Sequence, residues 1–291
     1  MTLKNSVSGA LLTLALTAPV AAHEPIGEGA ADLPLFDAHV HYKEPAWAPY
    51  PPETVLTLMD RNGVAMALVS STPDEGTIML WEHAPRRIVP ELRPYHGPFG
   101  SRNWMAADEM DAYIEQRLDA YPHRGIGEFH VHNAQTANED LLRQIAAMAL
   151  ARDIPIHIHS GAEPVRFFFR VAPDLTIIWA HAGMSEPPSV IGPLMDKHAR
   201  LFADTSYRES DILRGDPLNP DWQALLLRHA DRFMVGSDTW VNGQWASYDG
   251  IIEMNREWLA HLPRDVAEKI AYRNAEALFG IEVSKTLLGT R

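Results

Sequence analysis

The chain has no cysteine among its 291 residues. This absence excludes disulfide bonds, thiolate metal ligands and a cysteine nucleophile. The chain also lacks any run of lysine and arginine, and its net charge is −13. An acidic chain without a basic patch is a poor partner for nucleic acid or for an anionic membrane surface. We therefore expect its partner to be a small-molecule substrate and not nucleic acid.

Beyond its first residues, the chain has no hydrophobic run that could cross a membrane. Lys4 precedes a short apolar run over residues 9–16, and Val20-Ala21-Ala22 has the small residues of a cleavage site. This order is typical of a secretory signal peptide, and the run is too short to span a bilayer comfortably. We expect residues 1–22 to be a signal peptide, residues 23–34 a linker and residues 35–291 the folded domain. The protein would then be exported, to the periplasm; an uncleaved N-terminal anchor is the alternative.

Apolar runs of strand length alternate with segments of helical periodicity through the rest of the chain. The strand-like runs cover residues 35–41, 64–69, 88–95, 125–132, 156–159, 175–181, 201–205 and 232–238. Among the helices, one is expected from about residue 136, where Thr136 and Glu139 have the spacing of a capping box. Alternating strands and helices predict a parallel sheet with right-handed crossovers, and eight such units predict a single (β/α)8 TIM barrel of the α/β class. An open doubly wound sheet would usually carry a glycine-rich turn after its first strand, and this chain has none there.

The first predicted strand carries an acid and two imidazoles. In residues 35–41, apolar side chains alternate with Asp37, His39 and His41. Side chains alternate across a strand, so these three share one face. Polar groups buried on an apolar strand need partners, and a divalent metal ion suits two imidazoles at this spacing.

Later strands end in polar side chains of the same kind. The residues at the carboxyl ends of the predicted strands are His39, His41, Glu128, His159, His181 and Asp238. In a barrel these ends converge on one mouth, where active sites form. Imidazoles and carboxylates without a thiolate suit zinc or a similar divalent ion in an open, hydrolytic site.

In their order along the chain, these motifs resemble those of the amidohydrolase superfamily. The resemblance is to its amidohydrolase-2 type, which includes metal-dependent decarboxylases and lactonases. It runs from about Leu35 to Gly280. It rests on residues 37–41, 155–161, 179–183 and 235–238, and on the ending at residues 272–280.

The resemblance implies a site for one or two divalent ions such as Zn²⁺. His39, His41 and Asp238 would bind one buried ion, and His159 and His181 would complete that site or bind a second ion. Asp238 would also be the catalytic residue that takes the proton of the activated water and passes it to the leaving group. Elementary chemistry agrees, because a metal ion lowers the pKa of bound water and an adjacent carboxylate can accept the proton.

The fourth strand departs from the pattern of many relatives, which carry a carbamylated lysine there. None of the five lysines of this chain lies on that strand, and Glu128 is its only carboxylate. We expect Glu128 to be the bridging ligand or a ligand of a single ion. A hydrogen bond to the barrel floor is the alternative role for Glu128. His130 and His132 share its face, so either is an alternative ligand.

Several side chains near the strand ends are candidates for substrate contacts. Arg93 and Tyr95 near the end of the third strand, and Arg208 after the seventh, are expected to line the mouth. Arginine would bind a carboxylate through two hydrogen bonds. A solvent-exposed or structural ion pair is the alternative for each arginine. The similar candidates are Tyr42 and Lys43 after the first strand, Arg102 and Trp104 in the loop beyond the third, and Trp240 after the eighth.

Other polar residues are expected to support the ligands. Asp37 would orient a neighbouring group. His157 faces the same way as His159, and we expect it to be a buried histidine with satisfied hydrogen bonds. Asp204, near the end of the seventh strand, is expected to be structural or remote from the ligands.

Together these expectations describe an exported, metal-dependent hydrolase in which activated water attacks an amide, ester or lactone carbon. The first alternative is a single-zinc decarboxylase of the same superfamily. A non-catalytic metal-binding protein of the envelope is disfavoured, because Asp238 and Glu128 add acid and base capacity that storage would not need. Relatives often form homodimers, so a homodimer is a further expectation.

Overall fold

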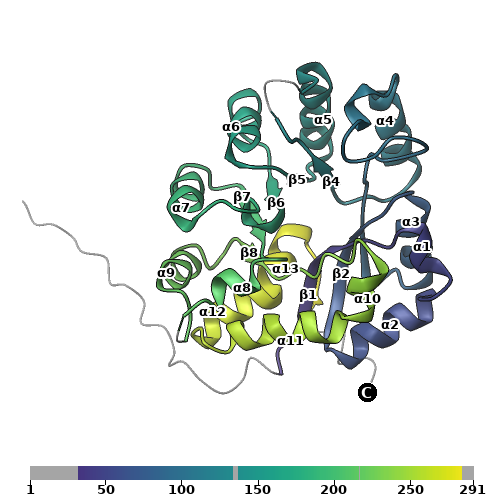
Figure 1. Ribbon diagram of the computed structural model, residues 1–291. Coiled ribbons are helices and arrows are strands. Elements are labelled where there is room, and N and C mark those ends of the chain that lie inside the picture. The colour runs from purple at the N-terminus through teal and green to yellow at the C-terminus, as the bar shows by residue number, and fades with distance from the viewer. Residues whose placement is uncertain (1–31, 134–136, 216, 284–291) are drawn as a thin grey trace, which may run out of the picture.

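The structure, a computed structural model, describes residues 32–133, 137–215 and 217–283. Parallel strands lie at its centre, inside a ring of helices (Figure 1). The strands are β1 (Leu35–Val40), β2 (Val64–Ser70), β3 (Ile88–Glu91), β4 (Ile126–His130), β5 (Ile156–His159), β6 (Ile177–Trp179), β7 (Leu201–Asp204) and β8 (Phe233–Met234). They pair in chain order, as β1-β2-β3 and as β4-β5-β6-β7-β8.

Backbone hydrogen bonds join these two sheets at both seams. Between β3 and β4, the Leu92 amide donates to the Gly125 carbonyl at 3.0 Å, and the Gly127 amide donates to the Leu92 carbonyl at 2.8 Å. Between β8 and β1, the Ala38 amide donates to the Val235 carbonyl at 2.9 Å. The fold is therefore the predicted (β/α)8 barrel.

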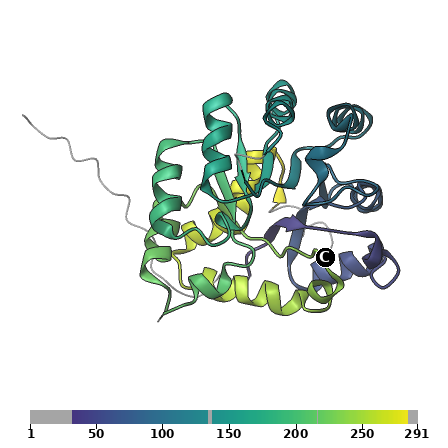
Figure 2. The ribbon, with the colours of Figure 1, turned by 45° about the horizontal axis from the view of Figure 1, so that its top comes forward.

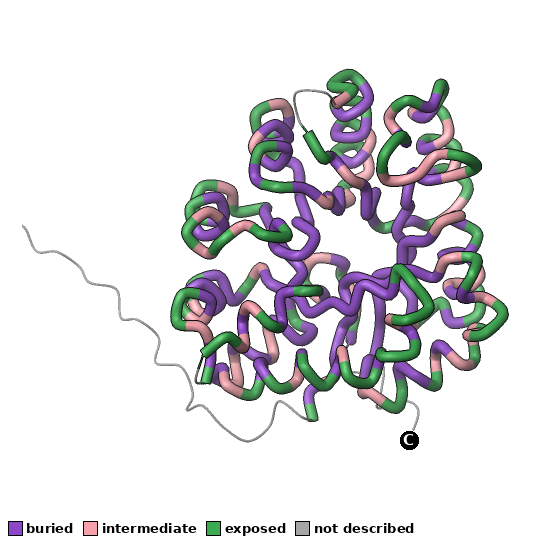
Figure 3. The backbone as a smooth tube through the Cα atoms, viewed as in Figure 1, coloured by how far each residue is buried: buried purple, intermediate pink, exposed green. Residues whose placement is uncertain are grey.

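The outer ring is seen from two directions in Figures 1 and 2. Its helices are α1 (Glu44–Trp47), α2 (Pro52–Arg61), α3 (Glu75–His83), α4 (Met110–Ala120), α5 (Glu139–Arg152), α6 (Ala162–Val171), α7 (Pro188–Lys197), α8 (Glu209–Ile212), α9 (Pro220–Arg228), α10 (Asn242–Ala246), α11 (Tyr248–Leu259), α12 (Arg264–Glu268) and α13 (Asn274–Phe279). Burial explains this arrangement: every residue of β2 is buried, as expected for a parallel strand covered on both faces. The helices turn their buried sides to the strands and their exposed sides outward (Figure 3).

Two details of the helices differ from the sequence-based expectation. Helix α3 was not predicted, because Ile78, Met79, Leu80 and Trp81 form a continuous apolar run instead of a helical stripe. Helix α5 begins at Glu139, and the side chain of Asn138 caps it by accepting a hydrogen bond from the Leu141 amide. The predicted capping box with Glu139 as its third helical residue is therefore wrong, and Thr136 lies outside the described residues.

The predicted signal peptide and most of the predicted linker also lie outside the described residues, which begin at Asp32. Within the described part of the chain, no helix combines the length and the apolar character that a membrane crossing requires.

Candidate metal centre

A cavity of about 630 Å³ opens where the strands end. Glu128 on β4, His159 at the end of β5 and Asp238 after β8 all line it. The predicted residues His181, Arg93 and Tyr95 line it as well. The barrel thus brings residues from opposite ends of the chain to one mouth, as parallel strands with active-site loops do.

The two histidines of β1 face each other in this site. Their Nε2 atoms are 3.1 Å apart. His39 Nδ1 donates to the Asp204 carboxylate at 3.2 Å, and His41 Nδ1 donates to the Ser70 carbonyl at 2.5 Å. When both rings are neutral, each Nε2 presents a lone pair to the other, whereas a protonated His39 donates from Nε2 to His41 Nε2. The close approach of the two nitrogens is therefore satisfied either by a proton or by a metal ion between them.

Asp238 completes this arrangement. Its Oδ1 atom lies 3.3 Å from His41 Nε2 and 3.6 Å from His39 Nε2. Oδ1 is buried and has no hydrogen bond from any described residue. A tetrahedral Zn²⁺ with ligand bonds of about 2.0 Å places its ligand atoms about 3.3 Å apart. The three residues therefore fit a divalent ion, both in donor type and in spacing.

The electrostatics of His39 and His41 point the same way. Burial lowers the pKa of His39, but the carboxylates of Asp204, Asp238 and Glu128 raise it well above its ordinary value. Burial, with a contribution from the Arg93 charge, lowers the pKa of His41 to about 4. The carboxylates thus attract positive charge to this pair of rings, while His41 keeps its lone pair for a ligand bond.

Glu128 lies between two pairs of histidines. Its Oε1 is 2.5 Å from His159 Nδ1, 3.4 Å from His181 Nε2 and 3.7 Å from His39 Nε2. Its Oε2 accepts a hydrogen bond from Arg93 Nη2 at 2.7 Å and lies 3.4 Å from His41 Nε2. The two carboxylate oxygens of Glu128 thus face the ring nitrogens of His39, His41, His159 and His181. Hydrogen bonding to the barrel floor through the side chain does not describe this arrangement.

The two alternative ligands on this segment are placed differently. His130 Nδ1 is bonded to the Tyr95 hydroxyl at 2.8 Å, and its ring stacks on that of His159 with centroids 3.9 Å apart. Burial lowers the pKa of His130 to about 2, so its ring is neutral. His132 is exposed. Glu128 therefore has the closest contacts with the other candidate ligands, and His130 forms one wall of the cavity.

The backbone directs His181 and Asp238 into the site. Both residues are left-handed, with φ of 55° and 49°. His181 Nδ1 lies 3.1 Å from the Ser206 carbonyl, to which it donates, so His181 Nε2 is free to face Glu128 and Asp238. The Asp238 amide donates to the His39 carbonyl at 2.7 Å. A left-handed conformation is costly for residues other than glycine and persists where the surrounding structure enforces it.

Asp37 ties the ligand strand β1 to the end of β8. Its carboxylate accepts hydrogen bonds from the Ser237 amide at 2.9 Å, the Tyr248 hydroxyl at 2.9 Å and the His39 amide at 3.3 Å. Burial raises the pKa of Asp37 to about 6, although these hydrogen bonds oppose the shift. Asp37 thus orients its neighbours, and it is not in contact with the ligand atoms described above.

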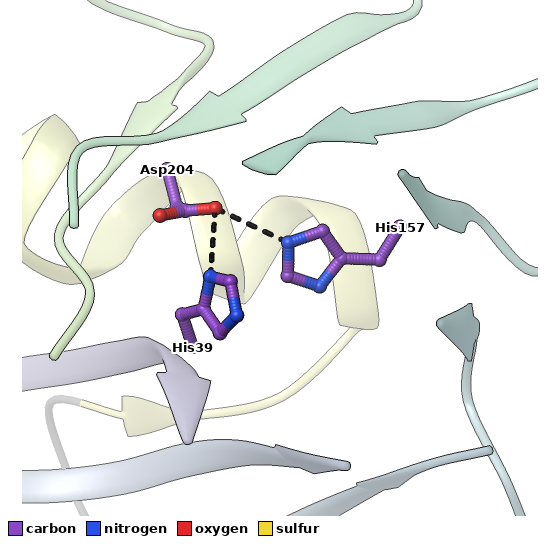
Figure 4. A group of neighbouring side chains, drawn as sticks. All are labelled: His39, His157 and Asp204. Carbon is purple, nitrogen blue, oxygen red and sulfur yellow. Dashed lines mark hydrogen bonds and ion pairs between the residues drawn. The ribbon is translucent and has the colours of Figure 1, made fainter. Parts of the chain in front are cut away.

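A second buried network supports His39 from below. Figure 4 shows Asp204 between His39 and His157, and its Oδ2 is 3.2 Å from His39 Nδ1 and 3.1 Å from His157 Nε2. His157 Nδ1 is 3.1 Å from Glu91 Oε2. Burial lowers the pKa of His157, but Glu91 and Asp204 raise it to about 9. Because one carboxylate oxygen accepts from both rings, hydrogen bonds satisfy this group without an ion.

His157 therefore has the hydrogen bonds expected of it, whereas Asp204 is closer to the site than expected. It contacts a candidate ligand directly, and it also accepts a hydrogen bond from the His181 amide at 3.2 Å. Carboxylates that hold a metal-binding histidine in this way orient the ring and raise its basicity. The signal in the sequence was its position at the end of β7, which is shared with the ligands on other strands.

Arg208 does not have the position expected of a substrate-binding residue. It is buried, and it donates to the carbonyls of Met184 and Glu186 and pairs with Asp211 at 2.8 Å. Arg208 is not one of the described residues that line the cavity. Its position argues against the predicted contact with substrate. Instead, Arg208 holds the loop that follows His181.

The outer part of the cavity has an apolar rim, formed by Met184, Tyr207 and Trp240. Their exposed fractions are 39%, 44% and 47%. Trp240 Nε1 donates to the Tyr207 hydroxyl at 2.8 Å. Lys43 and Thr72 line the same cavity. Met184, Tyr207 and Thr72 were not predicted, because they lie in loops whose path is set by tertiary packing.

Comparison with known proteins gives a family and a fold. The family model Amidohydro_2, described as amidohydrolase, matches residues 36–281. Among solved structures, YJJV of Escherichia coli, a TatD homolog, is 12% identical with a TM-score of 0.61, over 86% of this chain and 99% of that chain. No curated protein sequence matches this chain.

Two further solved structures show the same architecture. One is described as a probable 2-pyrone-4,6-dicarboxylic acid hydrolase of Acinetobacter baumannii. It is 13% identical with a TM-score of 0.57, over 86% of this chain and 100% of that chain. The dihydroorotase of Campylobacter jejuni is 11% identical with a TM-score of 0.56, over 87% of this chain and 86% of that chain. At these identities the similarity establishes the fold alone.

Proposed function

The chain belongs to the amidohydrolase family, and we propose that it is a metal-dependent hydrolase in which activated water attacks an amide, ester or lactone carbon. The observation that carries the proposal is the close approach of three candidate ligand atoms. These are Nε2 of His39, Nε2 of His41 and Oδ1 of Asp238, all within 3.6 Å of one another. A divalent ion bound there would polarise the substrate carbonyl and lower the pKa of water.

We propose Asp238 as the general base. Its Oδ1 faces the ligand nitrogens and has no hydrogen bond from a described residue, while its backbone is held by the His39 carbonyl. A carboxylate within reach of the water and the leaving group can take a proton from one and deliver it to the other. Its place on the cavity wall gives it access to both.

The remaining ligand atoms leave room for a second ion. His39, Glu128 and His181 form a second group of ligand atoms that are close together. Glu128 Oε1 is within 3.7 Å of a ring nitrogen of His39, His159 and His181. We propose Glu128 as the bridging ligand, which takes the place of the modified lysine of many relatives. Arg93 holds its second oxygen, so the carboxylate has one defined orientation.

The test combines metal analysis with a substrate screen. The purified protein is expected to contain one or two equivalents of a divalent metal, and a chelator should abolish turnover. The screen should include lactones, esters and N-acyl compounds, together with 2-pyrone-4,6-dicarboxylic acid, which is named for one structural neighbour. His181→Ala should abolish turnover, whereas His83→Ala, at an exposed histidine of α3, should not. Release of CO2 from an unsaturated acid without hydrolysis of any compound would favour the decarboxylase, and a protein without bound metal would refute the proposal.

We also propose that the protein is exported and that residues 1–22 are removed. The support is the order of Lys4, the short apolar run and the small residues before position 23. The mass of the mature protein from the envelope fraction tests this. A protein that begins at His23 is the expected result, and an intact N-terminus in the cytoplasmic fraction contradicts it.

A further inference from the structure

Two cationic side chains line the cavity next to the candidate metal centre. Lys43 follows the ligand strand β1 by three residues, and Arg93 follows β3 by two. Arg93 is buried, with 6% of its surface exposed. Lys43 is one of only five lysines in a chain of net charge −13, so its place in this cavity stands out against the charge of the chain.

Hydrogen bonds fix the Arg93 side chain and the backbone next to Lys43. Arg93 donates from Nε to the Glu128 carbonyl at 3.1 Å and from Nη2 to the Glu128 carboxylate at 2.7 Å. The segment of Lys43 runs beside that of Thr72, because the Glu44 amide donates to the Thr72 carbonyl at 3.4 Å. The Thr72 hydroxyl oxygen is buried and has no hydrogen bond from a described residue. Thr72, which also lines the cavity, thus offers a further donor for an anion.

The charge balance of the cavity depends on the ion. Among the described residues that line it, the carboxylates are Glu128 and Asp238, and both are candidate ligands. One divalent ion would balance these two negative charges. Lys43 and Arg93 would then give the cavity a net positive charge, while Arg93 stays paired with Glu128. Excess positive charge in a concave, partly desolvated site attracts an anion and accelerates its association.

Two aromatic side chains, Tyr207 and Trp240, line the cavity near Lys43. Trp240 and Tyr207 are joined by the hydrogen bond from the indole to the hydroxyl, which keeps the indole at the mouth. Lys43 Nζ lies 6.0 Å from the centroid of the Trp240 ring. A planar ligand stacked on this indole would therefore carry its substituents to the ammonium group.

We infer that the substrate is a flat organic acid, whose carboxylate is bound by Lys43 and Arg93 and whose planar part lies against Trp240. This inference rests on the proposed function, because the charge excess requires the metal ion. The scissile carbonyl would then lie toward Asp238, deeper in the same cavity. A neutral amide or ester of similar shape would leave the net positive charge of the cavity without a counter-charge, which is costly in a closed site.

Calorimetric titration of the full, metal-containing protein with benzoate and with benzamide tests this inference. The two probes have the same shape and differ in charge. Benzoate is expected to bind at least tenfold more tightly than benzamide, as for a charge-assisted contact. Lys43→Gln should weaken benzoate about tenfold and leave benzamide unchanged, and Lys43→Arg should restore benzoate. Lys197→Gln, at an exposed lysine of α7, is the matched control and should bind as the unmodified protein does.

Three results would overturn the inference. They are equal affinity for both probes, no binding of benzoate at millimolar concentration, and benzoate binding that Lys43→Gln does not weaken. The last result would show that the metal ion alone holds the carboxylate. Equal hydrolysis of neutral and anionic esters would support the proposed function but contradict this inference. Binding of benzoate through Lys43 without turnover of any compound would contradict only the proposed function.

Discussion

At the floor of the cavity, His39, His157 and Asp204 are fully buried, and Asp204 is bonded to both rings. At the rim, Tyr207 and Trp240 are 44% and 47% exposed. The floor residues have several partners each, so a change in one of them disturbs the ligand atoms above. The rim residues have few partners, so a change there alters which substrates the cavity binds. The floor is thus suited to hold the chemistry, and the rim to select the substrate.

The largest effect should come from the residue that lies between these regions. Asp238→Asn keeps the shape of the side chain but removes the base, so kcat should fall about 10²–10⁴-fold. Metal content and substrate screen should be measured on the same preparation. Asp231→Asn, at an exposed aspartate before β8, is the matched control. Full turnover in Asp238→Asn would remove Asp238 from the mechanism.

The next effect tests the floor. Asp204→Asn removes the negative charge that accepts from His39 Nδ1 and His157 Nε2. Metal affinity should fall about 10–100-fold, as for other carboxylates behind a metal-binding histidine. Competition with a chelator measures the affinity directly. An unchanged affinity combined with lower thermal stability would show that Asp204 is only structural.

A buried acid behind the site gives the stability of the protein a dependence on pH. Burial raises the pKa of Glu209 to about 7, although the hydrogen bond from Asn255 opposes the shift. Between its ordinary pKa near 4.5 and about 7 the folded state binds the extra proton, so rising pH destabilises it. From pH 5 to pH 8 this loss is about 2 kcal/mol.

Glu209→Gln should remove that loss, so the variant should be more stable than the unmodified protein at pH 8 and similar to it at pH 5, as measured by denaturant unfolding at both values. Glu253→Gln, at an exposed glutamate of α11, should leave the pH dependence unchanged. If Glu209→Gln and the unmodified protein lost the same free energy of unfolding between the two pH values, Glu209 would not be protonated in the folded state at pH 5.

The smallest effect is expected at the rim. The Tyr207 hydroxyl accepts hydrogen bonds from Trp240 Nε1 at 2.8 Å and from Gln244 Nε2 at 2.6 Å. Tyr207→Phe would release the indole, so KM should rise a few-fold while kcat and metal content stay the same. Steady-state kinetics measures KM and kcat separately, and metal analysis measures the metal content. A loss of metal would contradict the division between floor and rim.

Much of the barrel could be predicted from the residues, because a buried parallel strand needs a continuous apolar run. The runs at β2 and β5 correspond closely to the strands. Helix α3 could not be predicted, since it packs several sides against the protein and therefore shows no stripe. The N-cap of α5 was misplaced because Thr136 and Asn138 are both good caps, and local spacing does not decide between them.

The candidate ligands could be predicted because each ends an apolar strand. Arg93 and Arg208 both lie near the end of a predicted strand. Arg93 lines the cavity, whereas Arg208 donates to loop carbonyls. An arginine side chain is long, and its direction depends on acceptors supplied by distant segments. Asp204 was undervalued for a similar reason, since its two imidazole partners lie 165 and 47 residues away.

By itself, the sequence determined the donor types and their order, with imidazoles and carboxylates at strand ends and no thiolate anywhere. These are local properties, because a strand alternates its side chains whatever surrounds it. Only the tertiary structure decided which nitrogen of each histidine faces the site. The acceptors at Nδ1 are Asp204, Ser70 and Ser206, and they come from other strands and loops. A hydrogen bond that fixes the proton on one ring nitrogen leaves the other nitrogen free for a metal ion.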